Sequence, residues 1–217
     1  CYADGTMTPD FRWIVCAMER RGGDGDTINQ LVAIRATGGT PIVLHGVSDF
    51  VSSPRIDPTG RYLAWVTWDH PDMPWDSTQL WVAELDNTAE GLALRDPAVV
   101  AGGPDVSVQQ PLWDPAGRLW MISDDTDWWT LYAASTPGRP EKFTVRVDRT
   151  GDIGTPAWVF AQSRYGFLSD GRVVFAYTSD GVDHLAVLEP LTGEIDHLDV
   201  GATAISGIAT TATTALM

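Results

Sequence analysis

The chain has 217 residues, of which 44% are hydrophobic and ten are Trp, and this is enough apolar material for a globular core. Its 29 acidic and 14 basic residues give a net charge of −15, which argues against nucleic acids and anionic membranes as partners, because binding to phosphates rests on Lys and Arg. No apolar run approaches the roughly 20 residues that a membrane-spanning helix needs, so we expect a soluble protein.

The sequence also lacks the residue patterns of common metal and disulfide sites. Its two cysteines, Cys1 and Cys16, form no CxxC pair, and no His stands at metal-ligand spacing. We therefore predict no metal site and no cofactor, and the protein is expected in a reducing cytoplasm.

One short turn recurs along the chain. Its four copies end in Arg12, Arg61, Arg118 and Arg172, so the repeat period is about 50 residues. The second and third copies read Asp-Pro-x-Gly-Arg. In such a turn Pro presets φ, Asp binds the backbone that follows it, and Gly accepts a positive φ at little cost. The turn therefore joins two strands tightly.

Two apolar strands separated by a polar loop follow the turn in each repeat. In chain order, the first strand covers residues 11–18, 61–66, 118–122 and 172–177, and the second covers residues 30–34, 79–85, 130–133 and 184–188. Alternation along residues 62–68 leaves neither face polar, so both faces must be covered. We expect the indoles of Trp65, Trp81 and Trp120 to be substantially buried between sheets. Repeated sheets with two buried faces are typical of a β-propeller.

The predicted fold class is therefore all-β, a β-propeller of four-stranded antiparallel blades with about four blades present. Residues 1–217 are interpreted as one partial propeller domain. Its blades cover approximately residues 1–45, 49–101, 107–147 and 156–200, and a fifth begins within residues 205–217. The short fifth unit favours a fragment of an incomplete ring over the alternative of a closed four-bladed ring. Contact with the rest of the protein, or association between chains, would cover the open edges.

The stretch Trp-Asp-His-Pro-Asp-Met-Pro-Trp-Asp at residues 68–76 is the most distinctive part of the sequence. Together with residues 50–67 it resembles the N-terminal propeller of bacterial S9 serine peptidases, which include prolyl oligopeptidases, acylaminoacyl peptidases and dipeptidyl aminopeptidases. The resemblance continues through residues 80–85, 122–124, 128–129 and 162–167, and so covers nearly the whole chain. The Asp-Pro-x-Gly turn by itself is shared with TolB-like propellers.

This resemblance implies the substrate-gating part of a hydrolase that cleaves short peptides. In that family the propeller covers a C-terminal α/β-hydrolase domain, which carries the catalytic residues, and peptides enter the cavity between the two. The present sequence contains no G-x-S-x-G nucleophile elbow, so we predict no catalytic residue in it. The alternative function is a stand-alone, TolB-like propeller that binds a partner or a ligand.

Four residues are predicted to act on substrate entry, namely Trp68, His70, Trp75 and Arg164. The first three belong to a loop that is rich in aromatic, proline and acidic residues, and loops on a rigid sheet often carry binding residues. The alternative is that this loop packs on a neighbouring blade or on the hydrolase domain. Arg164 is able to bind a substrate carboxylate through two parallel hydrogen bonds, and the alternative for it is an ion pair between blades.

Overall fold

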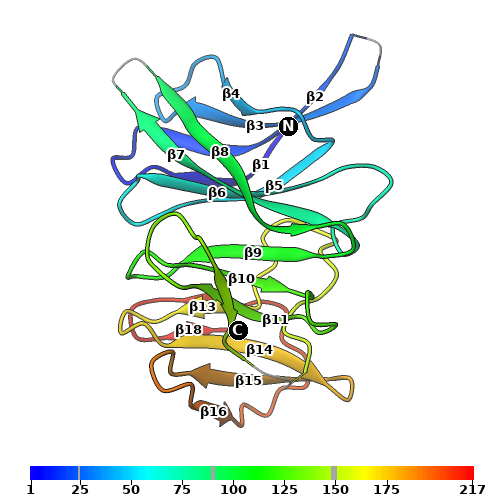
Figure 1. Cartoon of the computed structure of the whole chain (residues 1–217), viewed down its shortest axis with the longest axis vertical. Coiled ribbons are helices and arrows are strands. Elements are labelled where there is room, and N and C mark those ends of the chain that lie inside the picture. The colour runs from blue at the N-terminus through cyan, green and yellow to red at the C-terminus, as the bar shows by residue number, and fades with distance from the viewer. Residues whose placement is uncertain (24, 89–90, 148–150) are drawn as a thin grey trace. The chain divides into compact units, whose positions relative to one another are not determined.

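The computed structural model of this chain describes residues 1–23, 25–88, 91–147 and 151–217. Within these ranges the regular elements are β-strands (Figure 1). The described residues contain no helix long and apolar enough to cross a membrane. The chain divides into two compact units, Cys1–Pro111 and Leu112–Met217.

The first unit contains two four-stranded antiparallel sheets. Its first sheet has the order β1-β2-β3-β4, with β1 (Tyr2–Met7), β2 (Trp13–Arg21), β3 (Thr27–Arg35) and β4 (Ile42–His45). Its second sheet has the order β5-β6-β7-β8, with β5 (Phe50–Ile56), β6 (Tyr62–Trp68), β7 (Thr78–Asn87) and β8 (Leu92–Gly103). Each strand pairs with its neighbour in sequence, because short turns join antiparallel strands most simply.

The third sheet begins with a strand that spans the boundary between the units. It contains β9 (Val108–Trp113), β10 (Leu119–Ser123), β11 (Thr130–Ala134) and β12 (Phe143–Val145). The fourth sheet contains β13 (Tyr165–Phe167), β14 (Val173–Ser179), β15 (Val182–Leu188) and β16 (Ile195–Leu198). A two-stranded sheet of β17 (Ala209–Thr210) and β18 (Ala215–Leu216) follows. The prediction of about four antiparallel sheets of four strands each is confirmed.

The repeated turn is built around a buried aspartate. Between β5 and β6, Asp57 is 4% exposed, and its carboxylate accepts hydrogen bonds from the backbone N–H of Tyr62 at 2.6 Å and of Thr59 at 3.1 Å. Gly60 follows with a φ of 77°, and its N–H donates to the carbonyl oxygen of Asp57 at 2.9 Å. These bonds satisfy a charge that would otherwise be costly to bury. They are the physical reason for Asp at the start of the turn.

The first copy of the turn keeps this geometry with different residues. Thr8 stands in the place of Asp, and its Oγ1 accepts a hydrogen bond from the backbone N–H of Trp13 at 3.0 Å. Phe11 stands in the place of Gly, with a φ of 58°. For a bulky residue this conformation costs about 1 to 2 kcal/mol. The fold therefore accepts local strain in order to keep the turn.

Each unit has its own apolar core. In the first unit the core gathers residues of both sheets, among them Trp13, Leu31, Val51, Leu63 and Trp65. In the second unit the main core gathers residues of the third and fourth sheets, among them Trp120, Leu131, Tyr165 and Phe175. Sheet packs against sheet in both cores, as the apolar character of both strand faces predicts.

Two of the three indoles expected inside the core are fully buried. Trp65 and Trp120 are both 0% exposed, which confirms the prediction for them. Trp81 is partly buried and packs against the core of the first unit. Its ring stacks on Trp65 with a centroid distance of 5.9 Å and an interplanar angle of 11°, because the two residues face each other in the register of β6 and β7. Trp81 thus covers Trp65 and stays partly accessible itself.

Candidate functional site in the loop between β6 and β7

An aromatic cluster lies where β5 begins and β6 ends. Phe50 pairs with Trp68 in the strand register, and their rings stack with a centroid distance of 5.1 Å and an interplanar angle of 13°. His70 meets the ring of Phe50 edge-on, at 4.9 Å and 84°. We call Phe50, Trp68 and His70 the Phe50 cluster. The structure therefore brings two of the predicted site residues together around a third aromatic residue that the sequence analysis did not single out.

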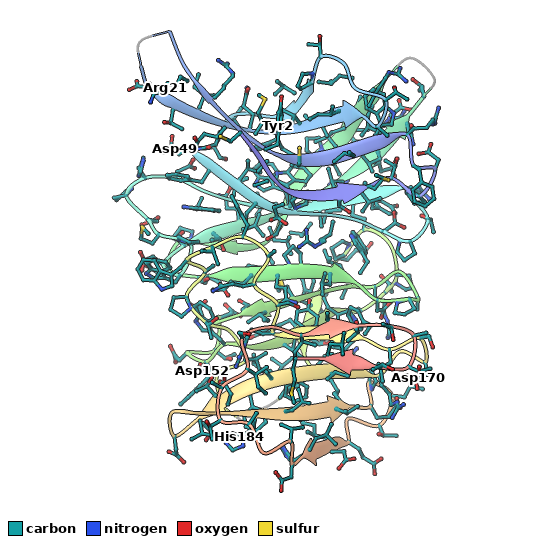
Figure 2. The ribbon with its side chains drawn as sticks, turned by 180° about the vertical axis from the view of Figure 1, so that it is seen from behind. Tyr2, Arg21, Asp49, Asp152, Asp170 and His184 are labelled. Atoms are coloured by element: carbon teal, nitrogen blue, oxygen red, sulfur yellow. The ribbon has the colours of Figure 1, made fainter. Side chains whose placement is uncertain are left out.

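Aspartates join this cluster to the preceding connection. Asp49, labelled in Figure 2, accepts a hydrogen bond from the backbone N–H of His70 through Oδ2 at 2.9 Å. In return Asp69 accepts one from the backbone N–H of Asp49 through Oδ1 at 2.6 Å. The side-chain amide of Asn29, on β3 of the first sheet, donates to the carbonyl oxygen of Asp49 at 2.8 Å. The loop is thus fixed to both sheets of the first unit. The side chain of His70 in this loop is exposed.

The far end of the loop is anchored separately. Pro74 is buried, and its carbonyl oxygen accepts a hydrogen bond from Oγ of Ser107 at 2.8 Å. Asp76 closes a small turn by accepting a hydrogen bond from the backbone N–H of Met73 at 3.0 Å. Trp75 lies between these anchors and is partly buried. An exposed imidazole and a partly exposed indole on a fixed loop offer flat aromatic surface to a ligand at small entropic cost.

A second histidine lies close to this loop, and the sequence analysis did not select it for a role. The His45 ring is 5.5 Å from the Trp65 ring and 5.1 Å from the Trp81 ring, and its Nε2 is 3.3 Å from Oγ of Ser48. Burial lowers the pKa of His45 below its usual value of 6.5, and the negative charge of Asp69 opposes this effect. The pKa of His45 therefore depends on the position of Asp69, whose side chain holds the loop.

Arg164 lies in the second unit, directly before β13, and is 5% exposed. Its guanidinium forms an ion pair with Asp183 on β15 at 3.1 Å. Its Nε donates to the carbonyl oxygen of Ile153 at 3.0 Å, and NH1 donates to that of Ile205 at 2.8 Å. These contacts favour the ion-pair alternative, with the difference that the pair lies inside the fourth sheet. Binding of a substrate carboxylate by Arg164 stays a prediction, and it would have to compete with Asp183.

The ion pair also changes the pKa of its acidic partner, Asp183. Burial by itself raises the pKa of Asp183, but hydrogen bonds from Arg164, from Oγ1 of Thr178 at 2.6 Å and from the backbone N–H of Ile205 at 2.7 Å outweigh it. The pKa of Asp183 is therefore lowered from its usual 3.8.

Among the described residues, no three side chains of His, Cys, Asp or Glu are gathered so that they could hold a metal ion.

No family model and no curated protein matches the sequence. Solved structures match nearly all of it. Puromycin hydrolase aligns with 99% of this chain at a TM-score of 0.88 and 27% identity, and a Mycobacterium tuberculosis puromycin-hydrolyzing peptidase aligns with 96% at 0.85 and 27%. Prolyl oligopeptidase B from Galerina marginata aligns with 97% at 0.71 and 12% identity. The predicted resemblance to the propeller of S9 serine peptidases is confirmed.

The four-stranded sheets of this chain are therefore propeller blades, and they resemble those of the S9 peptidases. The chain spans 33% of the length of the two puromycin-hydrolysing proteins and 28% of the prolyl oligopeptidase. TolB from Acinetobacter baumannii also aligns with 96% of the chain and is covered to 45%, but at a TM-score of 0.62 and 14% identity, which is a likeness of fold alone. The similarity to the peptidases is thus the more specific one.

Proposed function

We propose that this chain is the non-catalytic, substrate-gating part of a serine peptidase of the S9 type that acts on short peptides. The observation that carries the proposal is the match of 99% of this chain to one third of a puromycin hydrolase at 27% identity. The absence of a G-x-S-x-G sequence from the 217 residues supports the division of labour. The nucleophile, its base and the oxyanion hole would then belong to an α/β-hydrolase domain of the same protein.

The Phe50 cluster is the part of the chain that we assign to substrate entry. Its rings pack on one another and its loop is anchored at both ends, so it would present a fixed surface of aromatic and carboxylate groups to a passing substrate. Such a surface selects by positioning and leaves bond breaking unaffected. Because two matched proteins are named for hydrolysis of puromycin, puromycin is the first substrate to test beside short peptides.

Labelling with a fluorophosphonate tests the assignment of chemistry, since this reagent reports a serine activated by a neighbouring base. The chain of residues 1–217 should stay unlabelled and should not hydrolyse puromycin or peptides. The complete protein should be labelled on a serine outside these residues. Stoichiometric labelling of a serine within residues 1–217 would overturn the proposal.

Variants of the complete protein test the gating role. His70→Ala and Trp68→Ala should change the relative kcat/KM values for a set of short peptides, while the rate of fluorophosphonate labelling stays that of the unmodified protein. Leu191→Ala is the matched control, because Leu191 is 87% exposed in the turn between β15 and β16 of the other unit. Equal losses for all peptides together with slower labelling would contradict a role in selection.

The alternative function is a stand-alone propeller scaffold of the TolB-like type. The fold match to TolB supports it less strongly, because it rests on 14% identity. The two proposals differ in a simple observation. A coding sequence that contains this chain together with G-x-S-x-G and a downstream Asp and His favours the peptidase.

A further inference from the structure

His45 is the last residue of β4, and two indoles enclose part of its imidazole. The centroid of its ring is 5.5 Å from that of Trp65 on β6 and 5.1 Å from that of Trp81 on β7. The side chain is partly buried. A neutral imidazole packs well in such a place, whereas an imidazolium loses part of its hydration there. The surroundings of His45 therefore favour its neutral form.

The connection from β4 to β5 joins His45 to the Phe50 cluster. Nε2 of His45 is 3.3 Å from Oγ of Ser48. The next residue, Asp49, donates its backbone N–H to Oδ1 of Asp69 at 2.6 Å and accepts the N–H of His70 through Oδ2 at 2.9 Å. Asp49 is thus the residue through which this connection holds the loop after β6.

Asp69 is the charged group that acts on His45 from outside the connection. Its negative charge raises the pKa of His45, although burial outweighs this effect and keeps the pKa below the usual 6.5. In the described part of the chain, the strands packed around the imidazole present uncharged side chains. These are Trp65 on β6, Trp81 on β7 and Leu31, the register partner of His45 on β3. A proton on His45 therefore acts first on Asp69.

Asp69 meets two competing donors once His45 is protonated. A hydrogen bond between two ionised groups is about twice as strong as one between neutral groups, and the N–H of Asp49 is a neutral donor. A carboxylate that turns toward the imidazolium gives up its 2.6 Å bond with the N–H of Asp49. Loss of that bond loosens Asp49, whose own carboxylate holds the N–H of His70.

We infer that His45 is a positioning residue whose protonation draws Asp69 away from Asp49 and loosens the Phe50 cluster. Because the pKa of His45 in the folded chain lies below 6.5, the loop is fully held above pH 6.5 and is released as the pH falls through the folded-state value. The release depends on contacts within the first unit alone. Its effect on the choice of peptides rests on the proposed function.

Hydrogen exchange of the complete protein measures the release. After correction for the intrinsic pH dependence of exchange, the amides of Asp49 and His70 should exchange about tenfold faster at about pH 5 than at about pH 7. His45→Phe keeps an aromatic ring in place and cannot take up the proton, so this acceleration should be absent. His184→Phe is the matched control, because His184 is exposed on β15 of the other unit. It should behave like the unmodified protein.

A second variant, Asp69→Asn, separates the charge of this residue from its hydrogen bond. The amide oxygen of Asn accepts the N–H of Asp49 as a carboxylate does, but it forms no ion pair with an imidazolium. Exchange at Asp49 should therefore stay slow at about pH 5 in this variant. Acceleration of the same size in His45→Phe or Asp69→Asn overturns the inference. Exchange that does not change with pH in the unmodified protein overturns it as well.

Peptide kinetics of the complete protein separate this inference from the proposed function. The ratio of the kcat/KM values for two peptides cancels the pH dependence of the catalytic residues that both reactions share. This ratio should change between about pH 7 and about pH 5 in the unmodified protein and stay constant in His45→Phe. Faster exchange with a constant ratio supports the positioning role of His45 and contradicts selection by the Phe50 cluster. Unchanged exchange overturns the inference, whereas a labelled serine outside residues 1–217 still supports the proposed function.

Discussion

The two units hold their connecting segments by different chemistry. In the first unit, residue 49 and the loop after β6 exchange hydrogen bonds through Asp49 and Asp69, whose side chains are exposed. In the second unit, the segment before β13 is held by Arg164, which is 5% exposed and paired with Asp183. Water competes for the exposed carboxylates and hardly for the buried guanidinium. The same structural task is thus performed by a weak anchor in one unit and a strong one in the other.

The largest effect is expected from breaking the buried pair. Arg164→Leu should lower the free energy of unfolding by about 3 to 5 kcal/mol, because it leaves Asp183 without its cationic partner and removes the donor to the carbonyl oxygens of Ile153 and Ile205. Urea denaturation followed by Trp fluorescence measures this. Arg172→Leu is the matched control, since its ion pair with Asp170 is about half exposed and should contribute less than about 1 kcal/mol. Similar losses for both variants would remove the difference between the anchors.

Acid should weaken the buried pair in a defined direction. Because the pKa of Asp183 is lowered from 3.8 by folding, its contribution to stability is present above pH 3.8 and is lost as the pH falls through the lower, folded-state value. Asp183→Asn should be less stable than the unmodified chain near neutral pH and should show a shallower loss in acid. Unfolding midpoints measured between about pH 2 and pH 6 test this, and parallel pH profiles would contradict it.

A smaller effect is expected from the exposed anchor. Asp49→Ala removes the acceptor of the His70 N–H and should cost about 1 kcal/mol. It should also loosen the Phe50 cluster, which would appear as faster hydrogen exchange in residues 69–77 with little change elsewhere. Asp72→Ala in the same loop is the control for loss of charge alone. A cost above about 3 kcal/mol would show that this anchor is as strong as the buried one.

The smallest effect concerns His45, which lies beside the exposed anchor. Its pKa is lowered from 6.5 in the folded chain, so His45 binds a proton less readily in the folded protein than in the unfolded chain. The associated stability is complete above pH 6.5 and declines as the pH falls toward the folded-state value. Titration of Trp fluorescence should show a transition below pH 6.5 that His45→Phe abolishes, because His45 contacts Trp65 and Trp81. A transition that survives in the variant would assign it to another group.

The candidate site was predictable only where it depends on sequence neighbours. Trp68 and His70 stand two residues apart in a distinctive loop, and the structure joins them. Phe50, their common partner, is 18 residues from Trp68 in the sequence, and the register of β5 with β6 brings it there. A careful pairing of the two predicted strands would have suggested this contact. No local signal announces that Arg164 pairs with Asp183 or that Trp158 is exposed.

The sequence by itself determined the blades, because their causes are local. The turn needs only a side chain such as that of Asp or Thr that binds the next backbone groups and a residue with positive φ, which is most often Gly. A strand with two apolar faces must be covered on both. The tertiary structure decided which groups meet across long separations, such as Arg164 with Asp183 or Trp81 as the partly exposed cover of Trp65. It also decided which apolar residues remain exposed, such as Trp158, Val159 and Phe160. Burial and charge pairing depend on every neighbour a residue acquires in space, and the composition of a segment does not name those neighbours.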